Sequence, residues 1–193
     1  MVETQLGLVI DQERCIGCEA CTVACKNENL GSIGFIRVQT QDAAQKDIPA
    51  GKFPDLRMTF MPLVCNHCDR PPCEDACPVD AIEKRQDGVV ILDREACDGC
   101  RACVDECPYA AISFDEEAEH AEKCNLCAHR IDEGLEPFCV VCCEAQAIHF
   151  GDLNDPATTA GRLKRAETVF QLMPEQGTGP SVYYCPQMAP RGV

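Results

Sequence analysis

The chain has 193 residues and a formal charge of −15, which allows one or two compact, acidic domains. Aromatic residues make up only 5% and tryptophan is absent, whereas 18 residues are cysteine, so the cysteines must supply much of the stability. Such an acidic protein repels phosphate backbones, which excludes nucleic acid as a partner.

Two further protein classes are disfavoured by the distribution of apolar residues. A secreted disulfide scaffold is also rich in cysteine, but residues Met1–Gln5 are polar and lack the pattern of a secretion signal. No apolar run approaches the roughly 18 residues of a membrane-spanning helix. We therefore expect any attachment to a membrane, and any export, to depend on a partner.

The first predicted elements are a strand and a cysteine run. Leu6–Ile10 is apolar throughout and predicts a short buried strand. The first run, Cys15-x2-Cys18-x2-Cys21-x3-Cys25, has the spacing of a ferredoxin-type 4Fe-4S motif. Beyond it we expect a strand near Ile36–Thr40, a polar loop and a strand near Leu56–Phe60.

The middle of the chain contains two further runs. The second is Cys65-x2-Cys68-x4-Cys73-x3-Cys77-Pro78, and the third is Cys97-x2-Cys100-x2-Cys103-x3-Cys107-Pro108. Between them, Asp87-Gly88 separates two short apolar segments and predicts a hairpin. The module from Cys65 to Phe114 therefore has the run, hairpin, run and strand order of a bacterial two-cluster ferredoxin, in which the fourth cysteine of each run serves the other cluster.

The fourth run is less regular. Its expected ligands are Cys124, Cys127, Cys139 and Cys143, because this choice keeps the x3 spacing of the final pair, although Cys142 leaves the choice open. Ala147–Phe150 predicts a closing strand, and Asp155-Pro156 predicts the start of a helix that ends before Phe170. We expect the Gly- and Pro-rich tail, Met173–Val193, to be an extended arm on the domain or on a partner.

Zinc is the main alternative to iron and sulfur, since Cys-x2-Cys pairs also occur in zinc knuckles. Complete runs with spacings of 2, 2 and 3 favour cubane clusters.

His67 and His129 do not replace a cysteine in any quartet, which excludes a Rieske site and leaves ordinary hydrogen-bonding imidazoles. Cys142 and Cys185 remain unassigned and are expected to be small buried hydrophobic residues. Four cations flank the runs and either raise cluster potentials or are surface charges: Arg70, Arg101, Lys123 and Arg130.

With these residues identified, the chain resembles the four-cluster electron-transfer subunits of the dimethyl sulfoxide reductase superfamily of molybdopterin oxidoreductases, especially the short polysulfide and thiosulfate reductase type. The resemblance covers nearly the whole chain and rests on Lys26-x-Glu28-Asn29, Gly51-Lys52-Phe53-Pro54, Pro71-Pro72-Cys73, Cys107-Pro108-Tyr109, Lys123-Cys124-x2-Cys127 and Leu172-Met173-Pro174-Glu175-Gln176-Gly177. Cys100, which is sometimes lost in that family, is present, whereas Glu144 stands where the family often has proline.

The resemblance implies an α+β fold of two interleaved ferredoxin-like domains and four 4Fe-4S clusters. The outer domain would comprise residues 1–62 and 118–155, the inner domain residues 63–117, and a C-terminal helix and arm residues 156–193. Four quartets of ligands are implied: the Cys15 quartet (Cys15, Cys18, Cys21 and Cys143), the Cys65 quartet (Cys65, Cys68, Cys73 and Cys107), the Cys97 quartet (Cys97, Cys100, Cys103 and Cys77) and the Cys124 quartet (Cys124, Cys127, Cys139 and Cys25).

The implied function is electron relay in anaerobic respiration, without catalysis by this chain. The partners would be a large molybdopterin subunit, next to the Cys15 quartet, and a membrane anchor or soluble redox protein. Co-export with the large subunit would place the complex on the periplasmic side of the membrane. Two alternatives remain: a free polyferredoxin or electron subunit of a formate dehydrogenase or hydrogenase, and a zinc-stabilised interaction module.

Overall fold

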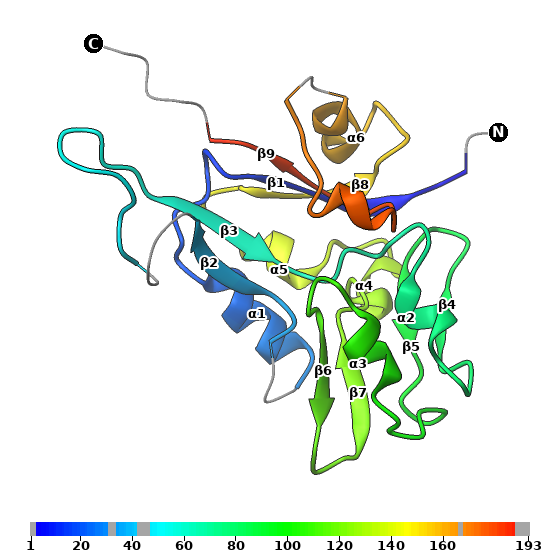
Figure 1. The fold of residues 1–193 in the computed structure, drawn as a ribbon. Coiled ribbons are helices and arrows are strands. Elements are labelled where there is room, and N and C mark those ends of the chain that lie inside the picture. Colours follow the sequence, from blue (N-terminus) through cyan, green and yellow to red (C-terminus); the bar gives the residue numbers. More distant parts are fainter. Residues whose placement is uncertain (1–2, 31–33, 42–46, 166–167, 188–193) are drawn as a thin grey trace.

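The computed structural model of the chain describes residues 3–30, 34–41, 47–165 and 168–187 (Figure 1). Its strands are β1 (Leu6–Asp11), β2 (Arg37–Gln41), β3 (Thr59–Leu63), β4 (Ile82–Lys84), β5 (Val90–Leu92), β6 (Ile112–Asp115), β7 (His120–Lys123), β8 (Ile148–Asp152) and β9 (Val182–Cys185). Its helices are α1 (Ala20–Glu28), α2 (Pro72–Asp75), α3 (Ala102–Glu106), α4 (Ala128–Ile131), α5 (Phe138–Val141), α6 (Thr159–Lys164) and the 3-10 turn η1 (Pro174–Gln176). This mixture of short elements agrees with the predicted α+β class.

A three-stranded sheet in the order β8-β1-β9 joins the two ends of the chain. The middle strand, β1, is antiparallel to β8 and parallel to β9. Leu8, Val9 and Ile10 have no exposed surface, because both faces of β1 are covered. A continuous apolar run is typical of such a strand, and the strand predicted at Leu6–Ile10 is confirmed.

The tail is the main correction to the predicted fold. Instead of forming only an extended arm, it contributes β9 to the central sheet, with Val182 and Tyr184 buried. Tyr184 stacks on Phe170 with ring centroids 5.5 Å apart, and its hydroxyl donates to the Pro62 carbonyl at 2.9 Å. The tail is therefore part of the core as far as Cys185, and its last six residues lie outside the described ranges.

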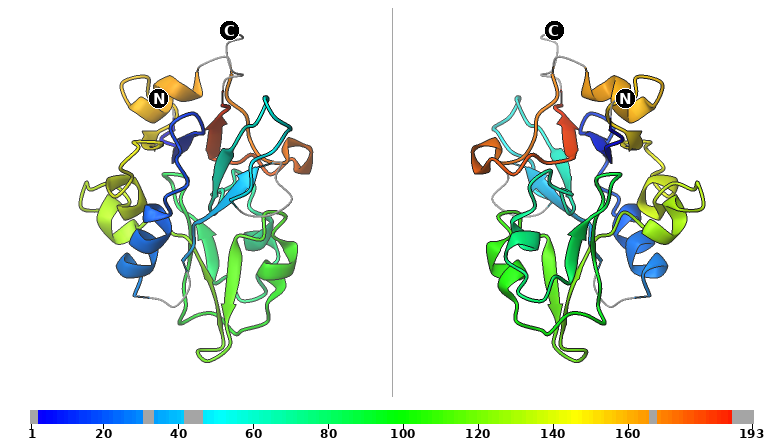
Figure 2. Two further views of the ribbon diagram at one scale, coloured as in Figure 1. Left: turned by 90° about the vertical axis from the view of Figure 1, so that its left-hand side faces the viewer. Right: turned by 90° about the vertical axis from the view of Figure 1, so that its right-hand side faces the viewer.

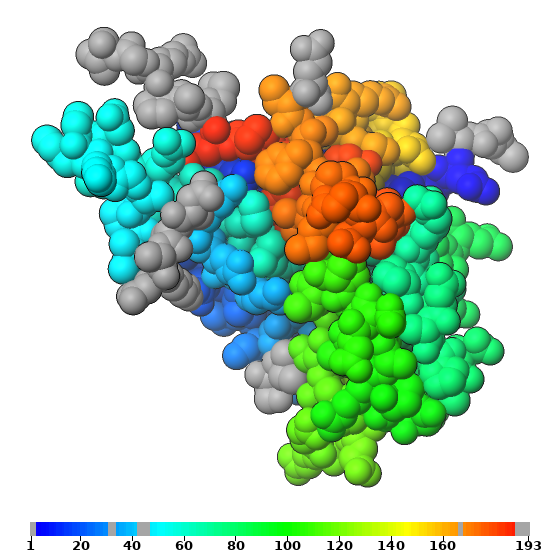
Figure 3. Space-filling model, in the orientation of Figure 1, coloured from blue at the N-terminus to red at the C-terminus, as the bar shows by residue number. Residues whose placement is uncertain are grey.

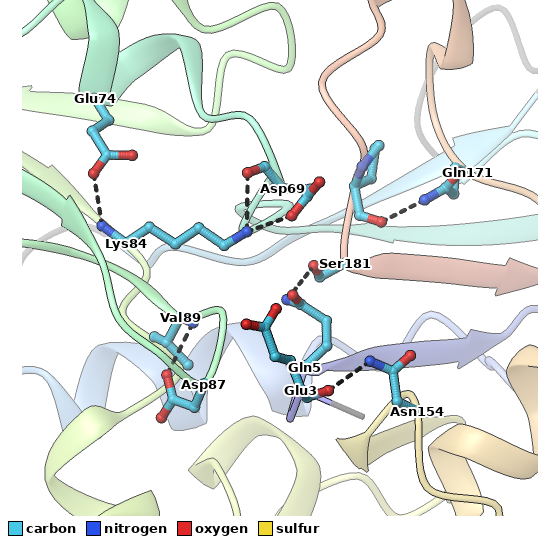
Figure 4. Close-up of polar contacts among 11 residues, drawn as sticks. Glu3, Gln5, Asp69, Glu74, Lys84, Asp87, Val89, Asn154, Gln171 and Ser181 are labelled. Atoms are coloured by element: carbon cyan, nitrogen blue, oxygen red, sulfur yellow. Dashed lines mark hydrogen bonds and ion pairs between the residues drawn. The ribbon is translucent and has the colours of Figure 1, made fainter. Parts of the chain in front are cut away.

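Three two-stranded hairpins accompany this sheet and lie below it in Figure 1, formed by β2–β3, β4–β5 and β6–β7. The hairpin predicted at Asp87-Gly88 is present, and the Asp87 carboxylate accepts a hydrogen bond from the Val89 N–H at 3.1 Å (Figure 4). The strand predicted near Leu56–Phe60 instead begins at Thr59. Its expected first residues belong to a loop closed by a bridge between Ala50 and Arg57.

The helix predicted to start at Asp155-Pro156 begins three residues later. Thr158 is the N-cap of α6, and its side chain accepts from the Gly161 N–H at 2.9 Å. The Asp155 carboxylate accepts instead from the Ala157 N–H at 2.8 Å, which makes Asp155 a turn residue. The helix ends at Lys164, before Phe170 as expected.

The cysteine-bearing helices pack in pairs drawn from distant parts of the chain. Helix α1, which follows the start of the first run, lies against α5 of the fourth run, and α2 of the second run lies against α3 of the third (Figures 1 and 2). The largest buried cluster mixes apolar side chains with Cys21, Cys25, Cys65, Cys124 and Cys139. The cysteines are thus part of the core rather than a separate surface site.

Candidate iron-sulfur site

The same backbone turn begins all four cysteine runs. The residue before the second cysteine has a positive φ in each run: 69° at Gly17, 41° at His67, 76° at Gly99 and 53° at Leu126. Glycine adopts this conformation freely, whereas His67 and Leu126 adopt it at a cost of roughly 1–2 kcal/mol each. Strain retained at equivalent positions indicates that the turn is needed for placing the two cysteines.

Three of the four predicted quartets surround cavities of similar size. The enclosed free volume is about 20 Å³ at the Cys15 quartet and about 10 Å³ at each of the Cys65 and Cys124 quartets. All four predicted cysteines line each cavity, three from one run and one from a different run. In the fourth run, Cys143 lines the cavity of the Cys15 quartet and Cys142 is not among its lining residues.

The other three cysteines of the Cys97 quartet lie close enough to Cys103 for their charges to act on its thiol. Burial, followed by the charges of Cys97, Cys100 and Cys77, raises the pKa of the Cys103 thiol to about 11. Cys77 belongs to the second run and the other three belong to the third. The structure therefore gathers this predicted set as well.

The four quartets lie next to one another in a definite spatial order. Burial raises the pKa of Cys139, and among the charges that add to this effect is that of Cys21, so the Cys124 and Cys15 quartets are adjacent. Burial also raises the pKa of Cys124, and the charge of Cys65, which belongs to the next quartet, raises it further. The pairing of α2 with α3 brings the Cys65 and Cys97 quartets together.

Backbone N–H groups reach the sulfur of the last cysteine in three runs. The donor is four residues further on and is always alanine: Ala81 to Cys77 at 3.2 Å, Ala111 to Cys107 at 3.5 Å and Ala147 to Cys143 at 3.2 Å. Such bonds stabilise a thiolate, because the sulfur carries negative charge. The first run differs, and there the Asn29 side-chain amide donates to Cys25 Sγ at 3.6 Å.

The chemistry of these donors fits a multi-iron cluster. Burial raises the pKa of the Cys21 thiol to about 11 and that of Cys73 to about 12, so a strong positive charge is needed to hold them as thiolates. Among the described residues, no group of three or more Cys, His, Asp or Glu side chains is arranged to hold a single metal ion.

The other singled-out residues mostly have structural roles. His67 is 1% exposed, and its Nδ1 accepts from the Val90 N–H at 3.0 Å. His129 and Arg130 both bond to the Glu28 carboxylate, Arg101 pairs with Glu116, and Arg70 donates to the Gly177 carbonyl. Cys142 and Cys185 were expected to be buried, and the structure shows both only partly buried.

Two features of the site were not predicted from the sequence, and for Lys123 the sequence did not decide between a charge near a cluster and a surface charge. Lys123 is not a surface charge, because its side chain is 5% exposed. Asn29 was not identified as a sulfur contact, since nothing in its local spacing differs from an ordinary helix. The recurrent alanine four residues after the last cysteine was a usable signal.

Paired cysteine runs, short strands and helices, and interior cavities lined by thiols define a ferredoxin-like protein for several iron-sulfur clusters. The sequence matches the 4Fe-4S dicluster domain twice, at residues 14–81 and at residues 56–153. It is 43% identical to a Halobacterium salinarum protein described as the iron-sulfur component of a dimethyl sulfoxide reductase, covering 94% of this chain and 79% of that protein.

Two other relatives belong to different reductases. A component of the tetrathionate reductase of Salmonella typhimurium is 38% identical, with 92% of this chain and 71% of the relative covered. The arsenate respiratory reductase iron-sulfur subunit of a Shewanella species is 33% identical, with 93% of this chain and 95% of the relative covered. The chain belongs to the iron-sulfur electron-transfer subunits of the dimethyl sulfoxide reductase family.

This membership confirms several predictions. Members are iron-sulfur subunits of reductase complexes, so the chain carries electrons and leaves catalysis to a partner. Two dicluster domains and 18 cysteines fit four 4Fe-4S clusters. Its placement nearest the polysulfide and thiosulfate reductase type stays a prediction.

Proposed function

We propose that the chain is a four-cluster electron wire in which each quartet combines three cysteines from one run with one from another. A 4Fe-4S cluster, when bound, accepts and releases a single electron. The ligand sets are the Cys15, Cys65, Cys97 and Cys124 quartets defined above. The observation that carries this proposal is that the cavities of three quartets are each lined by both contributing runs.

The proposed wire runs from the Cys15 quartet through the Cys124 and Cys65 quartets to the Cys97 quartet. The closeness of Cys21 to Cys139, and of Cys65 to Cys124, supports this order. Cys18 and Cys100, at the two ends, are exposed, whereas Cys65 and Cys124 in the middle are buried. Exposed ends allow partners to approach, and buried middle sites keep solvent away from the path.

The proposed domains are interleaved, with an outer part at residues 1–62 and 118–155 and an inner part at residues 63–117. Pairing of β1 with β8, and packing of α1 against α5, support an outer unit made from both ends of the chain. The boundary near residue 117 falls in the turn between β6 and β7, so one hairpin connects the two units. The third proposed part, 156–193, contributes β9 to the sheet of the outer unit.

We further propose that the partners are a molybdopterin catalytic subunit and a membrane anchor or soluble redox protein. None of the helices in the described part of the chain has the length and hydropathy that a bilayer crossing requires. Location would therefore follow the partners, with periplasmic co-export as the preferred arrangement. Co-purification with a subunit containing molybdenum or tungsten, followed by cell fractionation with and without that subunit, tests this part.

The cluster content is tested by anaerobic analysis of iron and acid-labile sulfide. We expect about sixteen iron atoms per chain, four for each cubane cluster. A plateau near half that value with stoichiometric zinc would contradict the proposal and support the zinc-stabilised alternative.

A further inference from the structure

The C-terminal tail covers the loop that joins the first two cysteines of the second run. The Asp69 N–H donates to the Gly179 carbonyl at 2.7 Å, and the Ser181 N–H donates to the Asn66 carbonyl at 2.7 Å. Figure 3 shows the tail, in orange, resting on the green surface of the inner part of the chain. His67 lies in the middle of the covered loop and is 1% exposed, so its ring is separated from bulk water.

One ring nitrogen of His67 has a partner that fixes the position of the ring proton. The Val90 N–H donates to His67 Nδ1 at 3.0 Å. A nitrogen that accepts a hydrogen bond has no proton of its own, so the ring is neutral and its single proton is on Nε2. His67 therefore offers an N–H donor at Nε2.

This donor has no acceptor in the part of the chain that the structure describes. The Nε2 atom is buried and makes no hydrogen bond to any described residue. Buried polar groups are almost always hydrogen-bonded, because burial removes their water without replacing it. We therefore expect the acceptor of the Nε2 proton to belong to a group that the protein binds.

The position of His67 indicates which bound group this is. His67 lines the cavity of the Cys65 quartet together with all four of its cysteines, and it does not line the cavities of the Cys15 and Cys124 quartets. The sulfurs of a cluster carry negative charge and accept hydrogen bonds from N–H groups. The Asn66 side chain is also buried without a partner, but no second bond fixes which end of its amide faces the cavity.

We propose that His67 Nε2–H donates a hydrogen bond to a sulfur of the cluster held by the Cys65 quartet and so raises the reduction potential of that cluster. This inference rests on the ligand assignment in the proposed function. Reduction adds one negative charge to the cluster and its sulfurs, so the donor stabilises the reduced form more than the oxidised form. Val90 keeps the donor in place, because it holds the ring by the other nitrogen.

The test compares two substitutions that each retain one of the two ring nitrogens in kind. His67→Asn places an amide oxygen near the position of Nδ1, where it can accept from Val90, but leaves no donor near the position of Nε2. His67→Gln places an amide nitrogen, which is a donor, near the position of Nε2. Asparagine also tolerates the positive φ of 41° at this position.

Each variant is purified anaerobically as the full chain, with its clusters and any bound partner, and iron analysis verifies that the cluster content equals that of the wild type. Midpoint potentials are measured by titration followed by electron paramagnetic resonance. The Cys73→Ser variant identifies the signal of the Cys65 quartet.

A second measurement uses the wild-type chain and does not depend on how a variant folds. The protein is labelled with ¹⁵N-histidine, and the reduced clusters are studied by pulsed electron paramagnetic resonance. This method detects the weak magnetic coupling of a nitrogen whose proton is hydrogen-bonded to a cluster sulfur. We expect a histidine coupling on the signal of the Cys65 quartet, and we expect it to disappear in His67→Asn.

We expect His67→Asn to reduce the equilibrium constant for reducing this one cluster about tenfold, which is a fall of about 59 mV for one electron. His67→Gln should retain most of the wild-type potential. An unchanged potential in His67→Asn, an equal shift of all four clusters, or the absence of a histidine coupling in the wild type would overturn the inference. If Cys73→Ser and Cys107→Ser disturbed different clusters, the quartet itself, and with it the proposed function, would be wrong.

Discussion

Asn29 Nδ2 lies 3.6 Å from Cys25 Sγ, whereas in the other runs the residue four positions after the last cysteine donates its backbone N–H. The difference follows from local structure, because Cys25 lies within α1 and the Asn29 N–H is used by the helix, donating to the Cys25 carbonyl at 3.1 Å. After Cys77, Cys107 and Cys143 the chain instead turns through a residue of positive φ, which frees the next N–H. In the first run a side chain thus takes the place of that particular donor. Burial raises the pKa of the Cys25 thiol, and backbone hydrogen bonds from Phe35 and Ile36 oppose this rise together with the Asn29 side chain.

Replacing Asn29 with leucine should lower the potential of the cluster of the Cys124 quartet, which includes Cys25. One hydrogen bond is worth about 1 kcal/mol, or roughly 40 mV for one electron. The measurement is a potentiometric titration followed by electron paramagnetic resonance. Asn27→Leu, on the exposed side of the same helix, is the matched control and should leave every potential unchanged. Equal effects of the two variants would show that helix stability, rather than the sulfur contact, is responsible.

The parts of this structure that were predictable are those specified by neighbours in sequence. The cysteine spacings indicated all sixteen proposed ligands, and the apolar run at β1 indicated a strand. By contrast, β9 pairs with a strand at the other end of the chain, and the Ser181 N–H beside it donates to the Asn66 carbonyl at 2.7 Å. No local pattern encodes such contacts, because they depend on how the whole chain closes.

Crossed ligation predicts that Cys25→Ser disturbs a cluster formed mainly by the fourth run. The signal shared with Cys124 variants should change, and the signal shared with Cys15 variants should persist, because Cys25 lines the cavity of the Cys124 quartet. Cys143→Ser is the reciprocal variant and should affect the signal of the Cys15 quartet. Electron paramagnetic resonance of the reduced variants provides the measurement. If each variant disturbed the cluster of its own run, ligation would be sequential and the interleaving wrong.

Removal of the clusters should abolish cooperative folding. Five buried cysteines belong to the largest core cluster, so the apoprotein would keep cavities and protonated thiols at its centre. Structural metal in zinc fingers contributes about 10–16 kcal/mol, comparable to the whole stability of a domain at about 5–15 kcal/mol. Circular dichroism and calorimetry of the reduced apoprotein should show no sharp transition, and reconstitution with iron and sulfide should restore it. A cooperative melt without clusters would refute this expectation.

Lys123 is a buried cation between the two middle quartets. Its ammonium group donates to the Cys124 carbonyl at 2.9 Å and to the Val90 carbonyl, and its charge acts on the Cys73 thiol of the neighbouring quartet. In the described part of the chain, no carboxylate lies within ion-pair distance of Lys123. A buried charge without a partner is costly, and anionic clusters on either side would provide the compensating charge.

Lys123→Met should therefore lower the potentials of the clusters in the Cys65 and Cys124 quartets. At an effective dielectric constant of about 20, a unit charge at a distance on the order of 8 Å contributes roughly 2 kcal/mol, or about 90 mV for one electron. Lys26→Met is the matched control, because Lys26 also adjoins a proposed ligand but is exposed, where solvent and salt screen its charge. Potentiometric titration of both variants shows whether the effect on the cluster potential requires a buried charge or only a lysine next to a ligand in the sequence. Similar small shifts in the two variants would mean that Lys123 is screened or neutral and does not set the potential of the middle of the wire.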